Sequence, residues 1–283
     1  METSDGGKKR LSVTNQWILD EHDQWTRVTV SPFYLELQKN SLKPEIFNRW
    51  LADQIIITSK LSIACERVQS KFASASPQLS ILPCSEIVDQ QYAWLLQQAT
   101  QLNVEMYKNP PEKRLAYGAQ HMIEQLEMAT SPNASLVTGL TAIWTICFAT
   151  AQGWRLCMKS SVLKSHQLYV NFGQYFTREE ALLAFVETQD VLDSLLTDGF
   201  YSTDKQNRVD VTTMHAESAH SGKDHGDLVT LSPHQTFLAM LRCIHAHLQH
   251  IVYRNTAGDK VFLCDKCGRH GHEEDICTFK GHV

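Results

Sequence analysis

Apolar residues recur every three to four positions along most of the chain, from about residue 11 to residue 200. This spacing is typical of amphipathic α-helices, and the alternating pattern of strands is rare here. The chain is therefore expected to be all-α. The pattern breaks where helices should end, at stretches rich in proline, serine and asparagine: 40–44, 73–77, 108–113 and 130–135.

The pattern also divides the chain into parts. Residues 1–10 are expected to form a disordered tail, and residues 11–256 a helical domain. Within this domain the polar stretch 201–232 has little apolar period and is expected to be an inserted loop. Residues 257–283 contain three closely spaced cysteines and are expected to form a small appendage.

One carboxylate lies on the apolar face of the helix that is expected after Pro44. At about 100° per residue, Asp53 shares a stripe with Trp50 and Ile57, so it should point into the bundle. A buried carboxylate must be paired, hydrogen-bonded or protonated, because its desolvation is costly. Asp53 is thus either a structural residue that bridges to a neighbouring helix or part of a functional site.

The segment 136–157 is apolar on nearly all sides, as expected of a helix in the middle of a bundle. Its Cys147 aligns with Ile143 and Trp154 on one face. Such a cysteine is a nucleophile if its thiolate is stabilised, and otherwise a small core residue. From the residues alone the second interpretation is favoured.

A last amphipathic helix is predicted at 233–253, with Ser232 as its N-cap. On this helix His247 shares a stripe with Ile244, so the imidazole should point into the bundle. It would then be either a general base opposite Asp53 or, in the commoner case, a core histidine with a hydrogen-bond partner.

The 283-residue chain is 43% hydrophobic, which allows a sizeable core. Its net charge of −5 gives no general signal for binding nucleic acid or an anionic membrane. No secretory signal is recognisable, and no stretch approaches the roughly 18 apolar residues of a membrane span. We expect an intracellular, cytoplasmic protein without membrane contact, although these features do not separate the cytoplasm from the nucleus.

The stretch CDKCGRHGHEEDIC, near the end of the sequence, has the spacing of a metal site. Three thiolates and one imidazole suit a tetrahedral Zn²⁺, and four protein ligands leave no open position for catalysis. So short a segment cannot fold by burying apolar surface, so the metal would supply its folding free energy. The predicted cofactor is one structural zinc ion, held by Cys264, Cys267, His272 and Cys277.

This motif resembles the zinc knuckle family over its whole length. Members of that family often bind single-stranded nucleic acid through stacking residues surrounded by lysine and arginine. Here acidic residues, including Asp265, Glu273 and Glu274, weaken the attraction for phosphate. A protein partner, or simple stapling of the tail, is therefore favoured over single-stranded nucleic acid.

Three stretches of the helical domain resemble the TenA/thiaminase II family: SPFYLELQKNSLKPEIFNRWLADQ, LTAIWTICFATAQGW and FVETQDVLDSLL. The resemblance extends over roughly residues 11–250 and implies a haem-oxygenase-like helical bundle. It would place Asp53 in a central pocket, where family members bind the amino-pyrimidine of thiamin breakdown products. We expect Trp50, Trp144 and His247 to line this pocket with Asp53. The resemblance also implies a homo-oligomer, and no organic cofactor.

The catalytic residues of that family are only partly present. One branch has a glutamate where this chain has Cys147, and the catalytic cysteine of another branch aligns with Thr145. A glutamate of the last helix is replaced by Ile244. Two hypotheses follow. The first is a thiamin-salvage-type hydrolase or binding protein for an amino-pyrimidine or related heterocycle, with Asp53 and Cys147 as candidate catalytic residues. The second is a non-catalytic helical scaffold whose zinc knuckle binds a protein or RNA partner.

Overall fold

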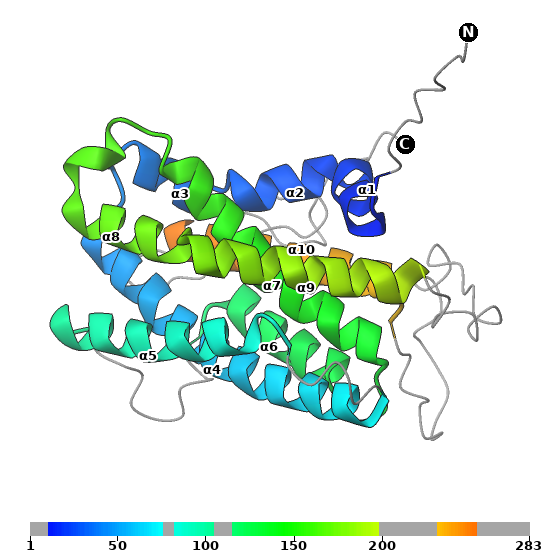
Figure 1. Ribbon diagram of the computed structural model, residues 1–283. Coiled ribbons are helices and arrows are strands. Elements are labelled where there is room, and N and C mark those ends of the chain that lie inside the picture. Colours follow the sequence, from blue (N-terminus) through cyan, green and yellow to red (C-terminus); the bar gives the residue numbers. More distant parts are fainter. Residues whose placement is uncertain (1–10, 76–81, 105–114, 198–230, 254–283) are drawn as a thin grey trace, which may run out of the picture.

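The computed structural model describes residues 11–75, 82–104, 115–197 and 231–253 (Figure 1). No strand occurs in these ranges, which confirms the all-α prediction. The tail 1–10, nearly all of the predicted loop and the whole zinc knuckle lie outside them. The helices are α1 (Val13–Asp20), α2 (His22–Thr29), α3 (Pro32–Gln38), α4 (Pro44–Ala75), α5 (Ser85–Gln101), α6 (Tyr117–Ala129), α7 (Leu136–Cys157), α8 (Gln167–Phe176), α9 (Glu179–Thr197) and α10 (Pro233–Tyr253), with a short 3-10 turn, η2 (Leu163–Ser165), before α8.

Helix α7 lies in the middle of the bundle and contacts α2, α3, α4, α6, α8, α9 and α10 (Figure 1). By length and composition it is apolar enough to cross a membrane, so the expectation that no stretch reaches this level was too strict. In the structure, 78% of its most apolar stretch is buried among the other helices. Its central place in the bundle accounts for its apolar character on nearly all sides.

Helix α4 is 32 residues long and begins at Pro44, as the sequence predicts. Proline suits the first turn because the N–H that it lacks would have no partner inside the helix. The turn before it contains Asn40 with a φ of 53°, a left-handed conformation that asparagine tolerates better than most residues. Helix α4 packs against α5, α6 and α7 and so borders much of the core.

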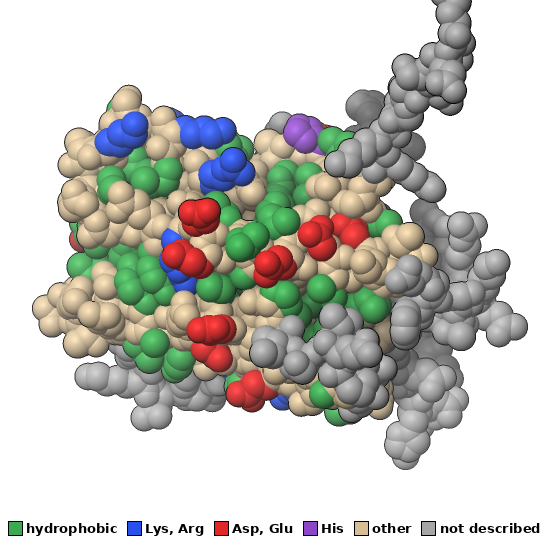
Figure 2. All heavy atoms as spheres, in the orientation of Figure 1, with side chains coloured by type: hydrophobic (Ala, Val, Ile, Leu, Met, Phe, Trp, Pro, Cys, Tyr) green, Lys and Arg blue, Asp and Glu red, His purple; other side chains and the backbone are tan. Residues whose placement is uncertain are grey.

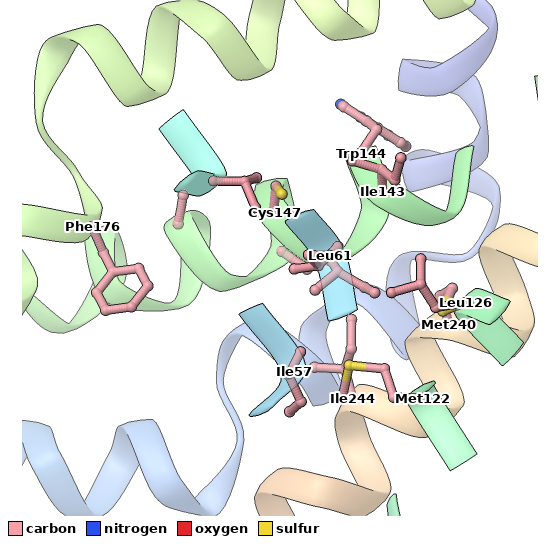
Figure 3. Packing of buried hydrophobic residues seen from close by; sticks show 14 of the residues in the cluster. Ile57, Leu61, Met122, Leu126, Ile143, Trp144, Cys147, Phe176, Met240 and Ile244 are labelled. Carbon is pink, nitrogen blue, oxygen red and sulfur yellow. The ribbon is translucent and has the colours of Figure 1, made fainter. Parts of the chain in front are cut away.

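Apolar side chains from four helices meet in the core around α4 (Figure 3). Full burial of one large apolar side chain contributes about 1.5–3 kcal/mol, so this cluster is a main source of stability. It also fixes the positions of polar residues one turn away along the same helices. The members labelled in Figure 3 include Ile57 and Leu61 of α4, Met122 and Leu126 of α6, Ile143 and Cys147 of α7, and Met240 and Ile244 of α10.

Helix α10 begins with the predicted cap. The Ser232 hydroxyl accepts a hydrogen bond from the Gln235 N–H at 3.2 Å. In return, the Gln235 side-chain carbonyl accepts one from the Ser232 N–H at 2.9 Å. Two N–H groups that would otherwise lack partners are satisfied in this way. The helix then runs beside α6 and α7, which brings its apolar face into the core.

Helix α1 is attached to α9 by a carboxylate. Asp193 accepts hydrogen bonds from the N–H and the hydroxyl of Thr14, both at 2.8 Å. Gln189 donates to the same hydroxyl at 2.8 Å. Because the first N–H groups of a helix have no acceptor within it, Asp193 acts as a cap supplied by another helix.

Acidic side chains gather along the middle of the face shown in Figure 2, over α9. Exposed acidic residues of this helix include Glu179, Glu180 and Glu187. Leu183 and Val186 lie among them with 56% and 44% of their surfaces exposed. Negative charge on this face is unfavourable for contact with phosphate groups.

Candidate functional site

The centre of the candidate site is the side chain of Asp53 on α4, which is fully buried. Its Oδ2 accepts a long hydrogen bond of 3.4 Å from the backbone N–H of Ala116. Ala116 is the N-cap residue of α6 and offers no side-chain cap of its own. The carboxylate therefore lies at the N-terminal, positive end of the α6 dipole.

The second member of the site is His247 on α10. Its imidazole is only 2% exposed, and Nε2 lies 3.3 Å from Oδ2 of Asp53. This distance is that of an ion pair, but among the described residues Nε2 has no partner with hydrogen-bond geometry. The structure thus places His247 opposite Asp53, and leaves a buried imidazole nitrogen without a well-directed acceptor or donor.

Gly118 on α6 allows α10 to pack closely against α6. A Cβ atom at this position would lie 2.1 Å from the backbone nitrogen of His247. Only glycine permits this approach of the two backbones. Two residues before it, Ala116 contacts Asp53. One close crossing of α6 and α10 therefore brings Ala116 and His247 into place beside Asp53.

Cys147 lies near the thiol of Cys84, and no contact in the described part of the chain joins it to Asp53 or His247. Burial, and to a lesser extent the neighbouring Cys84, raises the pKa of the Cys147 thiol well above its usual value. The group is therefore protonated near neutral pH. A protonated thiol is a poor nucleophile, so the environment of Cys147 does not activate it.

Thr145, the other candidate position on α7, is also fully engaged. It is buried, and its hydroxyl donates to the carbonyl of Thr141 at 2.7 Å. This bond back to the preceding turn is the usual way in which a helix satisfies a threonine hydroxyl.

The two tryptophans expected in the pocket lie in separate groups of aromatic rings. Trp50 packs against Phe33, with 5.2 Å between ring centroids, and also contacts Trp154 at 5.6 Å. Trp144 stacks on Phe237 at 6.0 Å, and its indole N–H has no hydrogen-bond partner among the described residues. These packing contacts account for both tryptophans as core residues, and their roles as ligand contacts stay predictions.

His245, two residues before His247, lies on another face of α10. Burial, and to a lesser extent the nearby Arg27, lowers the pKa of its imidazole to about 4. The ring is therefore neutral near pH 7, as a charged imidazole would be poorly solvated there.

No family model matches the chain, and no curated protein matches it either. Solved structures do. A TenA homologue from Pyrococcus furiosus matches with a TM-score of 0.61 and 14% identity, over 85% of this chain and 99% of that chain. The chain has the TenA fold. A TenA homologue from Pseudomonas syringae pv. tomato matches with a TM-score of 0.56 and 11% identity, over 84% of this chain and 91% of that one. A TenA homologue from P. horikoshii OT3 matches with a TM-score of 0.53 and 15% identity, over 85% and 97% of the two chains.

Within the TenA fold of this chain, the inward positions of Asp53 and His247 were predicted from the sequence, but the contacts of Ala116 and Gly118 were not. The available signal was a glycine near the start of a helical segment, a position that often marks close approach of another backbone. In the described ranges no group of three or more histidine, cysteine or acidic side chains could hold a metal. The predicted zinc ligands Cys264, Cys267, His272 and Cys277 lie outside these ranges and stay predictions.

Proposed function

We propose that this protein binds an amino-pyrimidine or a related small nitrogen heterocycle at Asp53 and His247. The observation that carries the proposal is the buried contact of 3.3 Å between the two side chains, in which His247 Nε2 lacks hydrogen-bond geometry. Buried polar groups are normally well paired, and functional sites are a common place for exceptions. The TenA fold and the sequence resemblance support this choice of ligand.

The chemistry of the pair fits such a ligand. An ionised carboxylate only accepts hydrogen bonds, whereas an imidazole nitrogen donates or accepts according to its tautomer. An amino-pyrimidine carries amino groups that donate beside ring nitrogens that accept. Asp53 would therefore receive the amino group, and His247 would meet a ring nitrogen or the reacting group. In a buried site these bonds are stronger than in water.

Binding would require some movement, because Asp53 and His247 are both buried. The ligand would separate the two side chains and take up hydrogen bonds with each. Their contact of 3.3 Å and the 3.4 Å bond from Ala116 are both longer than usual hydrogen bonds, so a ligand that offers well-directed groups could compete with them.

If the bound heterocycle is hydrolysed, we assign the proton transfer to His247 and not to Cys147. A histidine within reach of the ligand can take a proton from an attacking water and pass it to the leaving amine. Cys147 would first have to lose a proton that burial holds tightly. Water would thus replace ammonia at the aminomethyl carbon, or add to the formyl carbon so that formate leaves the amine.

The test is titration calorimetry and thermal melting with aminomethyl- and formylamino-pyrimidines, together with an assay for released ammonia and formate. At 100 times the dissociation constant, a ligand stabilises the native state by about 2.7 kcal/mol, which raises Tm by roughly 5–10 °C at this chain length. Asp53→Asn should abolish the shift, and His247→Gln should reduce it. Asp193→Asn, which alters the carboxylate that caps α1, is the matched control and should keep the shift.

Two results would contradict the proposal. One is the absence of a shift in the wild-type protein at millimolar ligand. The other is a shift of equal size in a folded Asp53→Asn variant. Product release that persists in His247→Gln would leave binding intact and refute only the assignment of the proton transfer.

We also propose that the C-terminal segment is a structural zinc knuckle for a protein partner. The spacing of Cys264, Cys267, His272 and Cys277, with glycines between them, supports this second function. Elemental analysis should find one zinc ion per chain, and Cys264→Ser should lose it. The melting of the helical bundle should stay unchanged, because none of these ligands belongs to the described helices. Zinc-dependent binding of a labelled single-stranded oligonucleotide would show that nucleic acid, and not protein, is the partner class.

A further inference from the structure

A cleft of about 820 Å³ opens between the C-terminal half of α4, the end of α6 and the turn that leads to α7. At 1.5 Å per residue, Arg67 in this cleft lies about 21 Å along α4 from Asp53. The cleft is therefore separate from the proposed heterocycle site. Its lining consists of Arg67, Ser70, Lys71, Glu127, Thr130, Ser131 and Pro132.

The ammonium of Lys71 is held in place in this cleft. It donates to the backbone carbonyls of Ser131 at 2.5 Å and Ala134 at 2.7 Å. An ammonium has three N–H donors, so one remains for another acceptor. No carboxylate pairs with Lys71 in the described part of the chain. Partial burial lowers the pKa of this ammonium, so its charge is incompletely solvated and has no counter-charge.

Arg67 lies one turn before Lys71 on the same side of α4 and also lines the cleft. Its side chain makes no hydrogen bond or ion pair with any described residue, so all five guanidinium donors are available. Ser131 adds a hydroxyl to the lining. The one acidic residue in the lining, Glu127, is paired with Lys60 at 3.0 Å. The described residues therefore leave the two cations of the cleft without a neutralising carboxylate.

We propose that this cleft binds the phosphate group of a small phosphomonoester. A phosphate dianion matches two uncompensated cations, and its oxygens can accept from the Arg67 fork, the third Lys71 donor and the Ser131 hydroxyl together. The cleft is several times larger than a phosphate ion, so it has room for the organic part. Inorganic phosphate offers the same oxygens without that part, and the two ligands are distinguished by experiment.

Lys71 also stabilises the turn between α6 and α7, because its ammonium binds two carbonyls there. Its substitution would therefore change the fold and the ligand site at the same time. Arg67 has no such structural contact, so it is the residue to change. Arg242 is the matched control, since it is an exposed arginine on α10 that does not line the cleft.

The experiment is titration calorimetry of the full-length protein with glycerol 2-phosphate, inorganic phosphate and, for comparison, glycerol. We expect saturable binding of the two phosphates, tighter for the ester, and none of glycerol. Arg67→Ala should weaken the binding of both by about tenfold or more, as for loss of a charge-assisted hydrogen bond, and Arg67→Lys by less. Arg242→Ala should bind as the wild type does, and affinity should fall with added salt.

Three outcomes would overturn the proposal. The first is the absence of saturable binding of either phosphate at millimolar concentration. The second is equal weakening of binding by Arg67→Ala and Arg242→Ala. The third is an affinity for glycerol equal to that for the phosphates. Tighter binding of inorganic phosphate than of the ester would refute the phosphomonoester as ligand and identify a site for the free ion. Because Arg67 is remote from Asp53, heterocycle binding should be the same in Arg67→Ala, so the two proposals fail independently.

Discussion

Helix α4 contacts α6 near both of its ends, through side chains of opposite charge. At the N-terminal end the Asp53 carboxylate accepts from the N–H of Ala116 and is fully buried. At the C-terminal end the Lys71 ammonium donates to the carbonyls of the following turn and lines an open cleft. Both charges interact favourably with the α6 macrodipole, because the anion lies at its positive end and the cation at its negative end.

The difference between the two ends is solvation. Asp53 is surrounded by protein, so removal of its charge leaves buried partners that water cannot reach. Lys71 is half-buried beside an open cleft, so water or an anion can replace what is lost there. The same kind of contact should therefore contribute more to stability at the buried N-terminal end of α6, here called the closed end, than at its C-terminal end beside the cleft, the open end.

The largest effect is expected from Gly118→Ala at the closed end. The added Cβ would lie 2.1 Å from the His247 nitrogen, and neither backbone can move without displacing its helix. We expect a loss of about 3 kcal/mol or more in the free energy of unfolding, measured with urea. Gly173→Ala is the matched control, because its Cβ would meet the flexible Met158 side chain at 2.2 Å. It should cost about 1 kcal/mol. If Gly118→Ala also cost only about 1 kcal/mol, α6 and α10 could move apart with little loss of stability.

The pair at the closed end should show coupling. Asp53→Asn and His247→Gln each disturb the 3.3 Å contact between two buried polar groups, so each should cost about 2 kcal/mol. The double variant should cost clearly less than the sum of the two, with a coupling energy of about 1 kcal/mol. Additive losses in urea unfolding would mean that the 3.3 Å contact contributes nothing to stability.

A pH titration tests whether a histidine of α10 limits stability at the same end. His245 has a pKa of about 4 in the folded protein, against about 6.5 unfolded. The unfolded state therefore binds the proton first as the pH falls. The contribution of neutral His245 to the free energy of unfolding should be fully present above pH 6.5. It should be lost between pH 6.5 and about pH 4, a decline of about 2 kcal/mol after allowance for partial exposure. In His245→Gln the unfolding free energy should decline less over this range, and an unchanged decline would assign it to other groups.

The smallest effects are expected at the open end. Lys71→Met removes two hydrogen bonds to carbonyls that remain partly accessible to water, so it should cost about 1 kcal/mol. Arg67→Ala should not change the free energy of unfolding measurably, because Arg67 has no described partner. A loss at Lys71 as large as that at Asp53 would remove the distinction between the two ends.

Much of the fold was predictable because the spacing of apolar residues along the chain indicates directly which side of each helix is buried. The start of α4 at Pro44, the cap of α10 at Ser232 and the central place of α7 all follow from local patterns. The inward positions of Asp53 and His247 follow from the same periodicity, since each shares a stripe with apolar residues.

The partners of these residues were not predictable in the same way. Ala116 contacts Asp53 through its backbone, which no side-chain pattern reveals. In the sequence Lys71 has no feature that distinguishes it from a surface lysine. Its contacts with the α6–α7 turn are visible only in the structure. The pKa of Cys147 depends on the whole core around it and not on its neighbours in the chain. Such properties come from the packing of helices that are distant in the sequence.

The contact at Gly118 has a consequence for how this protein varies among species. Because a Cβ there would overlap the backbone at His247, positions 53, 118 and 247 should change together or not at all. Chains that keep the pair should keep the glycine, and chains with any larger residue at 118 should have lost the histidine or the carboxylate. These three positions would then serve as a signature of this crossing of α6 and α10 in chains whose overall identity is too low to reveal it.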